Sequence, residues 1–260
     1  MEVDLLLDPF GASWPEMLEA TVAAEQAGFG GIWTWDHLAG SVHGQGHVLE
    51  CWTVLSALAA AVPRLMLGSL VLNVANRPAG TLAVMAATLQ HVSGGRLLLG
   101  IGAGGGRDTP YASEQLALGR EVGGDIRRRR QVEETIATLR QVWSGARNGV
   151  GGFLQPNPPV PIIVGGFGPK MAELAGRLAD GVNIPANAVD LIAVAQAARQ
   201  SGGAVDEPFL ITGSVGFSET LLQKNSPSLE RFSAAGFDRL ILGVRPPYPL
   251  DRIRSARLTA

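Results

Sequence analysis

Residues 24–37, AEQAGFGGIWTWDH, contain the end of a helical stretch, a glycine stop, a short apolar strand and a polar pair. The helical stretch begins at residues 13–16, SWPE, where the serine and the glutamate have the spacing of a capping box and the proline suits the first turn. Gly28 is a typical residue just after a helix. The apolar run Gly31–Trp35 has the length and composition of a buried strand. This segment therefore predicts one helix–strand repeat.

The same alternation continues along the chain, and it predicts parallel strands that are joined by crossover helices. Eight repeats in roughly 250 residues are typical of a (β/α)8 TIM barrel, whereas an open doubly wound sheet usually has fewer strands. No composition shift divides the sequence, so we expect a single domain over residues 1–260. The eight expected strands are Val3–Leu7, Gly31–Trp35, Met66–Val74, Arg96–Ile101, Pro161–Val164, Gly181–Ile184, Phe209–Ser214 and Arg239–Leu242. The expected helices after the first are Glu50–Val62, Gly80–Ser93, Asp125–Ser144, Pro169–Ala179, Asp190–Gln200 and Leu229–Ala235.

The composition excludes several classes of protein. The chain of 260 residues has 21 basic and 23 acidic side chains, and a net charge of −2 is not that of a dedicated nucleic-acid binder. Hydrophobic residues at 46% and charged residues at 17% predict a compact globule. The one cysteine, Cys51, cannot form an intrachain disulfide, which fits a reducing, cytoplasmic setting. The acidic residues 1–4 do not resemble a signal peptide, and no apolar stretch reaches the ~18 residues of a membrane span.

Polar residues at the carboxyl ends of barrel strands are the candidates for function, because the barrel interior is filled by apolar side chains and the active face lies at those ends. Asp36-His37 is the leading acid–base candidate, since an imidazole beside a carboxylate can hold or pass a proton near neutral pH. Asn73 ends a strongly apolar strand, where either a ligand or a backbone hydrogen bond has to satisfy its amide.

Two glycine-rich segments follow predicted strands. In Gly165-Gly166-Phe167-Gly168-Pro169-Lys170 the chain passes from a strand directly into a helix, so backbone N–H groups can approach a phosphate there. Lys170 either contacts that anion or lies solvated on the first helical turn. The segment from Gly100 to Gly105 matches GxGxxG, but loop residues follow it in place of a helix. We therefore expect Gly102, Ala103 and Gly104 to let a flat ring lie against the backbone, not to form a dinucleotide fold.

Three other features have a structural interpretation. His43 and His47 are four residues apart, but glycines between them favour a loop, and we expect no metal site. The four arginines Arg127–Arg130 open a helix that Asp125 is expected to cap. Such a run is usually a solvated face, and the alternative is that it holds an anionic tail. Trp52, Trp143 and Phe153 are expected in the core or on its outside wall.

At these residues the chain resembles the bacterial luciferase-like family, and within it the deazaflavin (F420)-dependent oxidoreductases. Each motif is weak alone, but five of them in the family's order are specific. The motifs are Ala24–Trp33 leading to Asp36-His37-Leu38; Trp52-Thr53 with Leu58–Ala60 and Leu67–Val71; Met85–Leu89 with Ser93–Leu97; Gly100–Gly104; and Gly165–Lys170 with Ala179–Asn183.

The resemblance implies that a cofactor ring lies across the barrel mouth, on a bulge with a non-proline cis peptide near Asn73-Val74. Asn73, Val74 and the glycine segment after the fourth strand would orient the ring. Gly165, Gly166 and Gly168, with Lys170 beside them, would contact the cofactor phosphate. Family members are commonly homodimers.

The implied reaction is hydride transfer between carbon 5 of F420 and a small organic substrate, with His37 as the proton partner and Asp36 steering it. An FMN-dependent monooxygenase is the alternative, because the quoted motifs suit both rings. A non-catalytic flavin-binding barrel is a second alternative. Sugar-phosphate dehydrogenases of the family place a glutamate after the glycines of the fourth strand, and here Gly105 or Gly106 stands there, which argues against a sugar phosphate as substrate.

Overall fold

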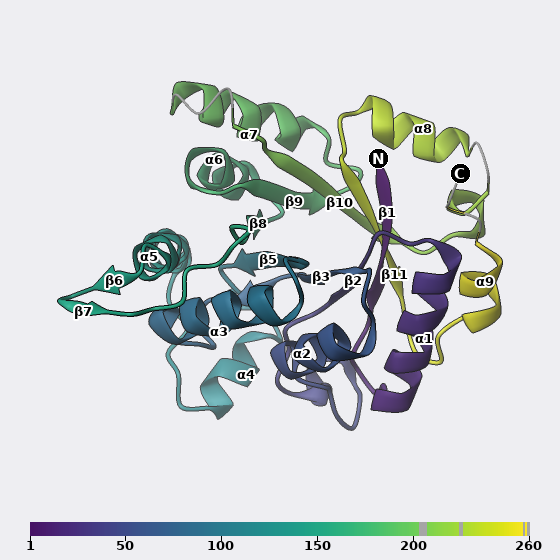
Figure 1. The fold of residues 1–260 in the computed structure, drawn as a ribbon, viewed down its shortest axis with the longest axis horizontal. Coiled ribbons are helices and arrows are strands. Elements are labelled where there is room, and N and C mark those ends of the chain that lie inside the picture. The colour runs from purple at the N-terminus through teal and green to yellow at the C-terminus, as the bar shows by residue number, and fades with distance from the viewer. Residues whose placement is uncertain (203–206, 224–225, 257, 259–260) are drawn as a thin grey trace.

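The protein folds as a closed parallel barrel. The computed structural model describes residues 1–202, 207–223, 226–256 and 258. In this part of the chain, strand pairing runs in the order β3-β2-β1-β11-β10-β9-β8-β5, and β3 also pairs with β5, so the sheet closes on itself. Helices surround the strands on the outside (Figure 1). The barrel strands are β1 (Glu2–Leu7), β2 (Gly31–Thr34), β3 (Met66–Ser69), β5 (Leu97–Gly102), β8 (Ile162–Gly165), β9 (Gly181–Pro185), β10 (Leu210–Gly216) and β11 (Arg239–Val244). The predicted TIM barrel and its eight strands are confirmed.

The predicted helices are present with small shifts at their ends. Helix α1 has the expected capping box, in which the Ser13 side chain accepts from the Glu16 amide and the Glu16 carboxylate accepts from the Ser13 amide. Gly28 follows the helix with φ of 87°, a conformation that favours glycine. The helices are α1 (Trp14–Ala27), α2 (Cys51–Ala61), α3 (Ala79–Val92), α5 (Asp125–Trp143), α6 (Pro169–Leu178), α7 (Asp190–Ser201) and α8 (Pro227–Ala234).

The expected strand Met66–Val74 is divided in two. The barrel strand β3 ends at Ser69, the Leu70–Val71 peptide is cis, and β4 (Leu72–Asn73) follows and pairs with β5. The prediction that the cis peptide lies near Asn73-Val74 is therefore wrong by three residues. A run of apolar residues cannot reveal such an interruption, because Leu and Val suit both a strand and a bulge.

Several short elements lie outside the predicted helices and strands. Helix α4 (Ala112–Ala117) and the hairpin of β6 (Ala146–Arg147) and β7 (Val150–Gly151) are too short to show a periodic pattern. The hairpin projects from the barrel in Figure 1. Two single turns, η1 (Gly40–His43) and η2 (Glu219–Leu221), and helix α9 (Leu250–Ser255) complete the described elements.

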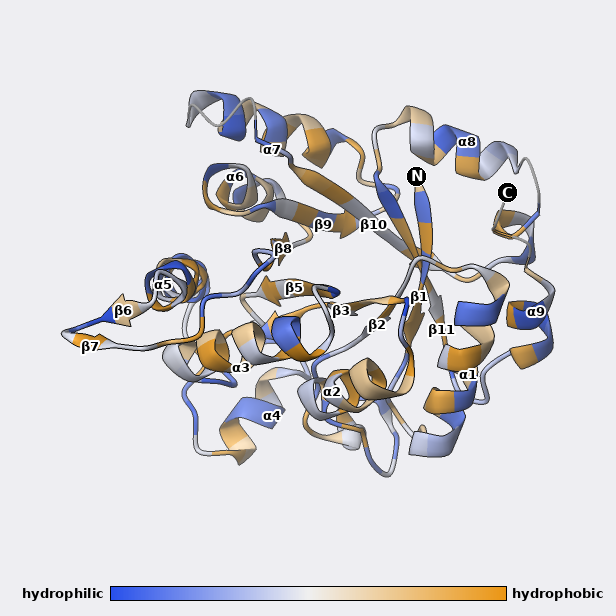
Figure 2. Cartoon of the chain, viewed as in Figure 1, coloured by the Kyte–Doolittle hydropathy of each residue, from blue (hydrophilic) through white to orange (hydrophobic). Residues whose placement is uncertain are grey.

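Apolar side chains fill the barrel inside and outside. Leu6, Trp33, Leu98, Ile163 and Ile241 come from five different strands and pack together, which places them on the barrel axis. A larger cluster joins the outward side chains of the strands to the helices, and it includes Trp52, Trp143 and Phe153, as expected. The strands have mostly hydrophobic colours in Figure 2, whereas the helices around them are mixed.

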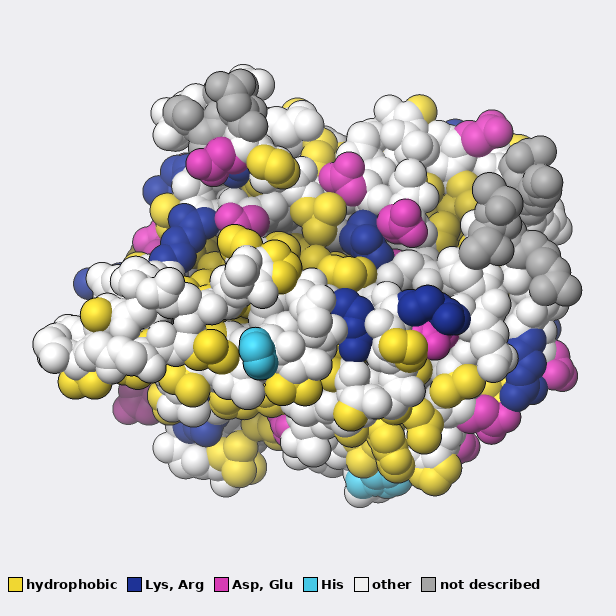
Figure 3. Space-filling model, viewed as in Figure 1, with side chains coloured by type: hydrophobic (Ala, Val, Ile, Leu, Met, Phe, Trp, Pro, Cys, Tyr) yellow, Lys and Arg dark blue, Asp and Glu magenta, His cyan; other side chains and the backbone are white. Residues whose placement is uncertain are grey.

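The surface shows no strong separation of charge on the face seen in Figure 3, where acidic and basic side chains lie interspersed. Among the described residues, none of the helices is both long enough and apolar enough to cross a membrane.

Candidate active site

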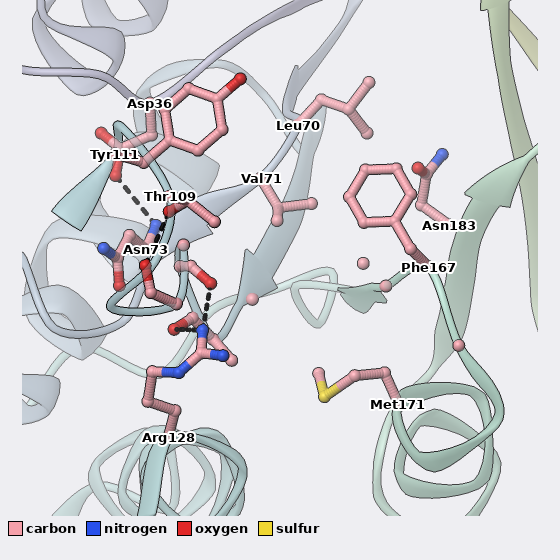
Figure 4. Close-up of a pocket in the computed structure, with 18 of the residues that line it drawn as sticks. Asp36, Leu70, Val71, Asn73, Thr109, Tyr111, Arg128, Phe167, Met171 and Asn183 are labelled. Atoms are coloured by element: carbon pink, nitrogen blue, oxygen red, sulfur yellow. Dashed lines mark hydrogen bonds between the residues drawn. The ribbon is translucent and has the colours of Figure 1, made fainter. Parts of the chain in front are cut away.

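A cavity of about 700 Å³ opens at the carboxyl ends of the strands. Its walls come from segments far apart in the sequence, which the barrel brings to one mouth. In Figure 4, Asp36, Asn73, Thr109 and Tyr111 lie on one side, Phe167, Met171 and Asn183 lie opposite, and Val71 projects between them. The predicted site residues that line the cavity are Asp36, His37, Asn73, Gly102, Ala103, Gly104, Gly165, Gly166, Gly168 and Lys170.

Glycines surround the Val71 side chain on the floor of the cavity. A Cβ atom on Gly102 would lie 2.6 Å from Cγ2 of Val71, and one on Gly165 would lie 2.7 Å from its Cγ1. Both distances are shorter than real Cβ contacts. Any residue other than glycine at either position would therefore displace the Val71 side chain. The floor that results has the shape and the apolar character that suit a planar ring.

Val74 does not belong to this floor. Its side chain is 3% exposed and packs in the core, outside the cavity lining. Leu70 and Val71, at the cis peptide, line the cavity instead. The expectation for Val74 fails for the same reason as the expected cis position, since both rest on an uninterrupted strand.

Asp36 holds the strand ends together and does not bind His37. Its buried carboxylate accepts from the Asn73 amide at 2.9 Å and from the two terminal nitrogens of Arg77 at 2.9 and 2.7 Å. Arg77 also donates to Glu50, and these two carboxylates raise the pKa of its guanidinium although burial opposes the shift. The prediction that Asp36 steers His37 is therefore wrong.

The partner of His37 is Glu114 on α4. Nδ1 of His37 lies 3.2 Å from both carboxylate oxygens of Glu114, whose side chain is 5% exposed. The amides of Leu38 and Ala39 also donate to this carboxylate at 3.2 Å. Burial alone would raise the pKa of Glu114, but these hydrogen bonds and the imidazole outweigh it, so the pKa lies below its usual value.

Glu114 lies in a stretch without periodicity, so no local sequence pattern indicated it as a site residue. The only available signal was the coincidence of an acidic residue with the segment that follows a barrel strand, where active-face loops occur.

Cationic side chains collect where α5 and α6 begin. Lys170 stands on the first turn of α6, and the N-cap residue of that helix, Gly168, has no side chain to satisfy the first amides. Arg129 and Arg128 on α5 line the same end. This part of the mouth has the charge and the exposed backbone that suit a phosphate.

The arginine run is thus more than a solvated face. Arg128 donates to the carbonyl oxygens of Ala103, at 3.3 Å, and Gly104, and so supports the segment after β5. Asp125 does not cap the helix as predicted: the N-cap is Gly124, and the Asp125 carboxylate accepts from Arg128 at 2.7 Å.

The backbone satisfies part of the hydrogen-bonding capacity of the Asn73 side chain, because its Oδ1 accepts from the Ala75 backbone amide at 3.0 Å. The two histidines His43 and His47 have separate surroundings. His43 ends the turn η1 and lines the cavity, whereas Nε2 of His47 lies 3.0 Å from the Ala12 carbonyl.

The closed barrel, the glycine floor at its mouth and the adjoining cationic end define a class of barrel proteins that can hold a ring cofactor with a phosphate. Comparison of the sequence with known families narrows this class of proteins to one family. Residues 3–206 match the family model described as luciferase-like monooxygenase, and the chain belongs to this family. The resemblance inferred from the motifs is confirmed.

Curated relatives are similar to this chain over part of their length. An F420-dependent glucose-6-phosphate dehydrogenase of Beutenbergia cavernae is 33% identical over 64% of this chain and 51% of its own. An F420-dependent hydroxymycolic acid dehydrogenase of Mycobacterium tuberculosis is 34% identical over 70% of this chain and 52% of its own. The chain thus spans about half the length of the curated relatives it matches.

Solved structures share the fold. An F420-dependent secondary alcohol dehydrogenase in complex with an F420-acetone adduct has a TM-score of 0.82 at 17% identity, and the match covers 99% of this chain and 98% of the other. Monooxygenase RslO1 from Streptomyces bottropensis has a TM-score of 0.69 at 20% identity, with 99% and 97% covered.

Proposed function

We propose that this protein is an F420-dependent oxidoreductase that transfers a hydride between carbon 5 of the deazaflavin and a small organic substrate. The observation that carries the proposal is the His37–Glu114 pair beside the glycine floor, because it provides a positioned proton carrier where a ring can lie. The F420 dependence of the relatives with 33% and 34% identity supports the choice of cofactor.

His37 is the catalytic residue of this proposal. Glu114 accepts a hydrogen bond from Nδ1, which leaves Nε2 as the nitrogen that exchanges a proton with the substrate. Asp36 acts indirectly. Its carboxylate binds Arg77 and the backbone amide of Asn73, and so holds the ends of β2 and β4 in register. In this way it positions the wall that carries His37.

Other residues would hold the cofactor. The flat floor of Gly102 and Gly165 around Val71 would support the ring, with Asn73, Ala103 and Gly104 beside it. The Gly168 amide and the Lys170 ammonium would bind the phosphate. The Gly166 amide donates to the Asn183 carbonyl at 3.1 Å, so Gly166 would contribute only by its lack of a side chain. When bound, F420 supplies a carbon that accepts or donates a hydride.

An FMN-dependent monooxygenase is the second candidate. It is favoured by the family description and by the monooxygenase among the structural neighbours, and the flat floor suits either ring. A non-catalytic flavin-binding barrel is the third, and it differs from the other two only in turnover.

A paired titration of the purified protein with F420 and with FMN, followed by tryptophan fluorescence, separates these candidates. Trp35 lines the cavity, so a ring bound there is expected to quench it. We expect tighter binding of F420. Preferential binding of FMN, with oxygen consumption when the reduced flavin is supplied, would contradict the proposal, and so would binding of neither cofactor.

We further propose that residues 1–260 act as one domain, as a homodimer and in the cytoplasm. The resemblance to the family supports the dimer, and the composition with its lone cysteine supports a reducing compartment. Sedimentation of the purified protein measures the assembly, and a monomer at all concentrations would exclude the dimer.

A further inference from the structure

The wall of the cavity at the ends of β9 and β10 carries polar side chains that the proposed mechanism does not use. Asn183 on β9 and Ser214 on β10 line the cavity there, beside the apolar Leu70 and Pro185. In Figure 4, Asn183 projects from the wall opposite Tyr111. Because the inside of a closed barrel is normally filled by apolar side chains, these two polar groups are candidates for ligand contacts.

The hydrogen bonds around Asn183 fix the direction of its side-chain amide. Thr212, its neighbour on β10, donates its hydroxyl hydrogen to the Val182 carbonyl at 3.2 Å. Oγ1 of Thr212 can therefore only accept from Asn183, and the amide atom 2.7 Å away from it has to be the nitrogen Nδ2. The amide oxygen Oδ1 consequently faces away from Thr212, and none of the described residues donates a hydrogen bond to it.

This oxygen requires a hydrogen-bond donor from the ligand. Asn183 is 7% exposed, and polar atoms at such depth are nearly always hydrogen-bonded in folded proteins. The Ser214 hydroxyl also has no hydrogen-bond partner in the described part of the chain, and it follows Thr212 by two positions on the same face of β10. The wall therefore offers one acceptor and one hydroxyl to a group that enters the cavity.

The chemistry of this wall selects a neutral group. The described lining residues that β9 and β10 contribute are Asn183, Pro185 and Ser214, and none of them is charged. A carboxylate or a phosphate dianion has only acceptors and would meet the lone pairs of Oδ1, whereas an ammonium would find no counter-charge on these strands. A primary carboxamide has both an N–H donor and a carbonyl acceptor, so it matches the amide oxygen and the hydroxyl together.

We infer that Asn183 and Ser214 bind a neutral carboxamide group of the substrate. Its N–H donates to Oδ1 of Asn183, and its carbonyl oxygen accepts from the Ser214 hydroxyl. The inference rests on the proposed function, in which F420 takes the floor at Val71 and the cationic end at Lys170 and so leaves this wall to the substrate. Asn183 thus determines specificity and takes no part in the hydride transfer.

The test compares benzamide with N,N-dimethylbenzamide, which keeps the carbonyl oxygen but has no N–H group. Each probe is added to the protein saturated with oxidised F420, which has no hydride to give, and its Kd is measured by calorimetry. We expect benzamide to bind about fivefold more tightly, the usual contribution of one hydrogen bond. Asn183→Leu should remove this preference by weakening benzamide alone, and Ser214→Ala should weaken both probes, because both present a carbonyl oxygen.

Thr212→Val tests the direction of the amide while Asn183 is kept. Valine cannot accept from Nδ2, so the amide is free to turn its NH2 group toward the cavity, and the preference for benzamide should fall. The matched control is Asn187→Leu, because Asn187 is exposed in the turn after β9 and does not line the cavity. This variant should keep the preference of the wild type, and the Kd of F420 should be the same in all four variants.

The remaining outcomes decide against a stated claim. Equal binding of the two probes to the wild type, or a preference that persists in Asn183→Leu, would overturn the inference while the proposed cofactor stands. A weaker Kd of F420 in Asn183→Leu with an unchanged preference would assign this wall to the cofactor and would also overturn it. If F420 itself fails to bind, the proposed function has failed, and the preference between the probes in the unliganded protein then tests the wall alone.

Discussion

At the scale of single residues, His37 and Glu114 give the site its proposed chemistry. Removing the imidazole by His37→Ala takes away the proton carrier and leaves the glycine floor intact. We expect hydride transfer to fall about 10²- to 10⁴-fold, the usual contribution of a general acid or base. The Kd of F420 should change by no more than about twofold, since a lost proton carrier does not alter the ring seat.

Single-turnover kinetics with F420 and a fluorescence titration measure these two effects. Unchanged hydride transfer in the variant would show that His37 is not the proton partner.

Glu114 should make the stability of the protein depend on pH. Its folded pKa lies below the ordinary 4.5, so the ionised carboxylate stabilises the folded state fully above that pH. This stabilisation is lost as the pH falls from 4.5 through the folded pKa. Glu114→Gln should therefore be less stable than the wild type near neutral pH, and the difference should shrink in acid.

Urea unfolding between about pH 3 and pH 7 measures this difference. Glu134→Gln is a suitable control, because that carboxylate is 62% exposed and pairs with Arg130 on the same helix. A difference between Glu114→Gln and the wild type that is constant over this range would contradict the assignment.

At the scale of elements, the junction of β3 and β4 with the ends of β5 and β8 forms the floor on which we propose that the ring lies. Gly165→Ala places a methyl group 2.7 Å from Cγ1 of Val71, so the Val71 side chain has to move into the cavity. We expect F420 binding to weaken about tenfold, equivalent to about 1.4 kcal/mol. Stability should change less, because the displaced side chain has open space before it.

Gly216→Ala is the matched control. Gly216 also ends a barrel strand, and nothing lies within 4 Å of its Cβ position, so this change should leave F420 binding as in the wild type. Equal affinities of Gly165→Ala and Gly216→Ala would show that the ring does not lie on this floor.

At the scale of the whole molecule, the closed barrel keeps stability and function at opposite ends. Asp4 on β1 is fully buried and accepts from Arg239 on β11 at 2.7 and 2.8 Å and from the Trp33 indole at 2.8 Å. It thus connects the first and last strands near their amino ends, away from the cavity. Asp4→Asn leaves Arg239, only 12% exposed, without its counter-charge.

We expect Asp4→Asn to lower the free energy of unfolding by about 3 kcal/mol, the lower end of the cost of breaking a buried ion pair. The Kd of F420 should not change. Chemical denaturation and a fluorescence titration measure both, with the exposed Glu2→Gln on the same strand as control. A loss of F420 affinity without loss of stability would contradict this separation of the two ends.

Much of the molecule follows from local sequence patterns. Apolar runs and helical periodicity predicted the eight strands and the main helices, and the capping box of Ser13 and Glu16 predicted where α1 begins. The glycine segments predicted which loops line the cavity. These features depend on neighbouring residues, whose side-chain period and backbone preferences act over a few positions.

Only the tertiary structure decided which side chains meet at the mouth. His37 and Glu114 are 77 residues apart, Asp36 and Arg77 are 41 apart, and His43 and Tyr111 are 68 apart. The sequence placed Asp36 beside His37, but both lie in the loop after β2, where Asp36 binds Arg77 and His37 binds Glu114. The sequence by itself determined the barrel and the strand ends that line the cavity, because local pattern is enough for both. Closing the sheet decided the partners, because it brings together loops that no local pattern connects.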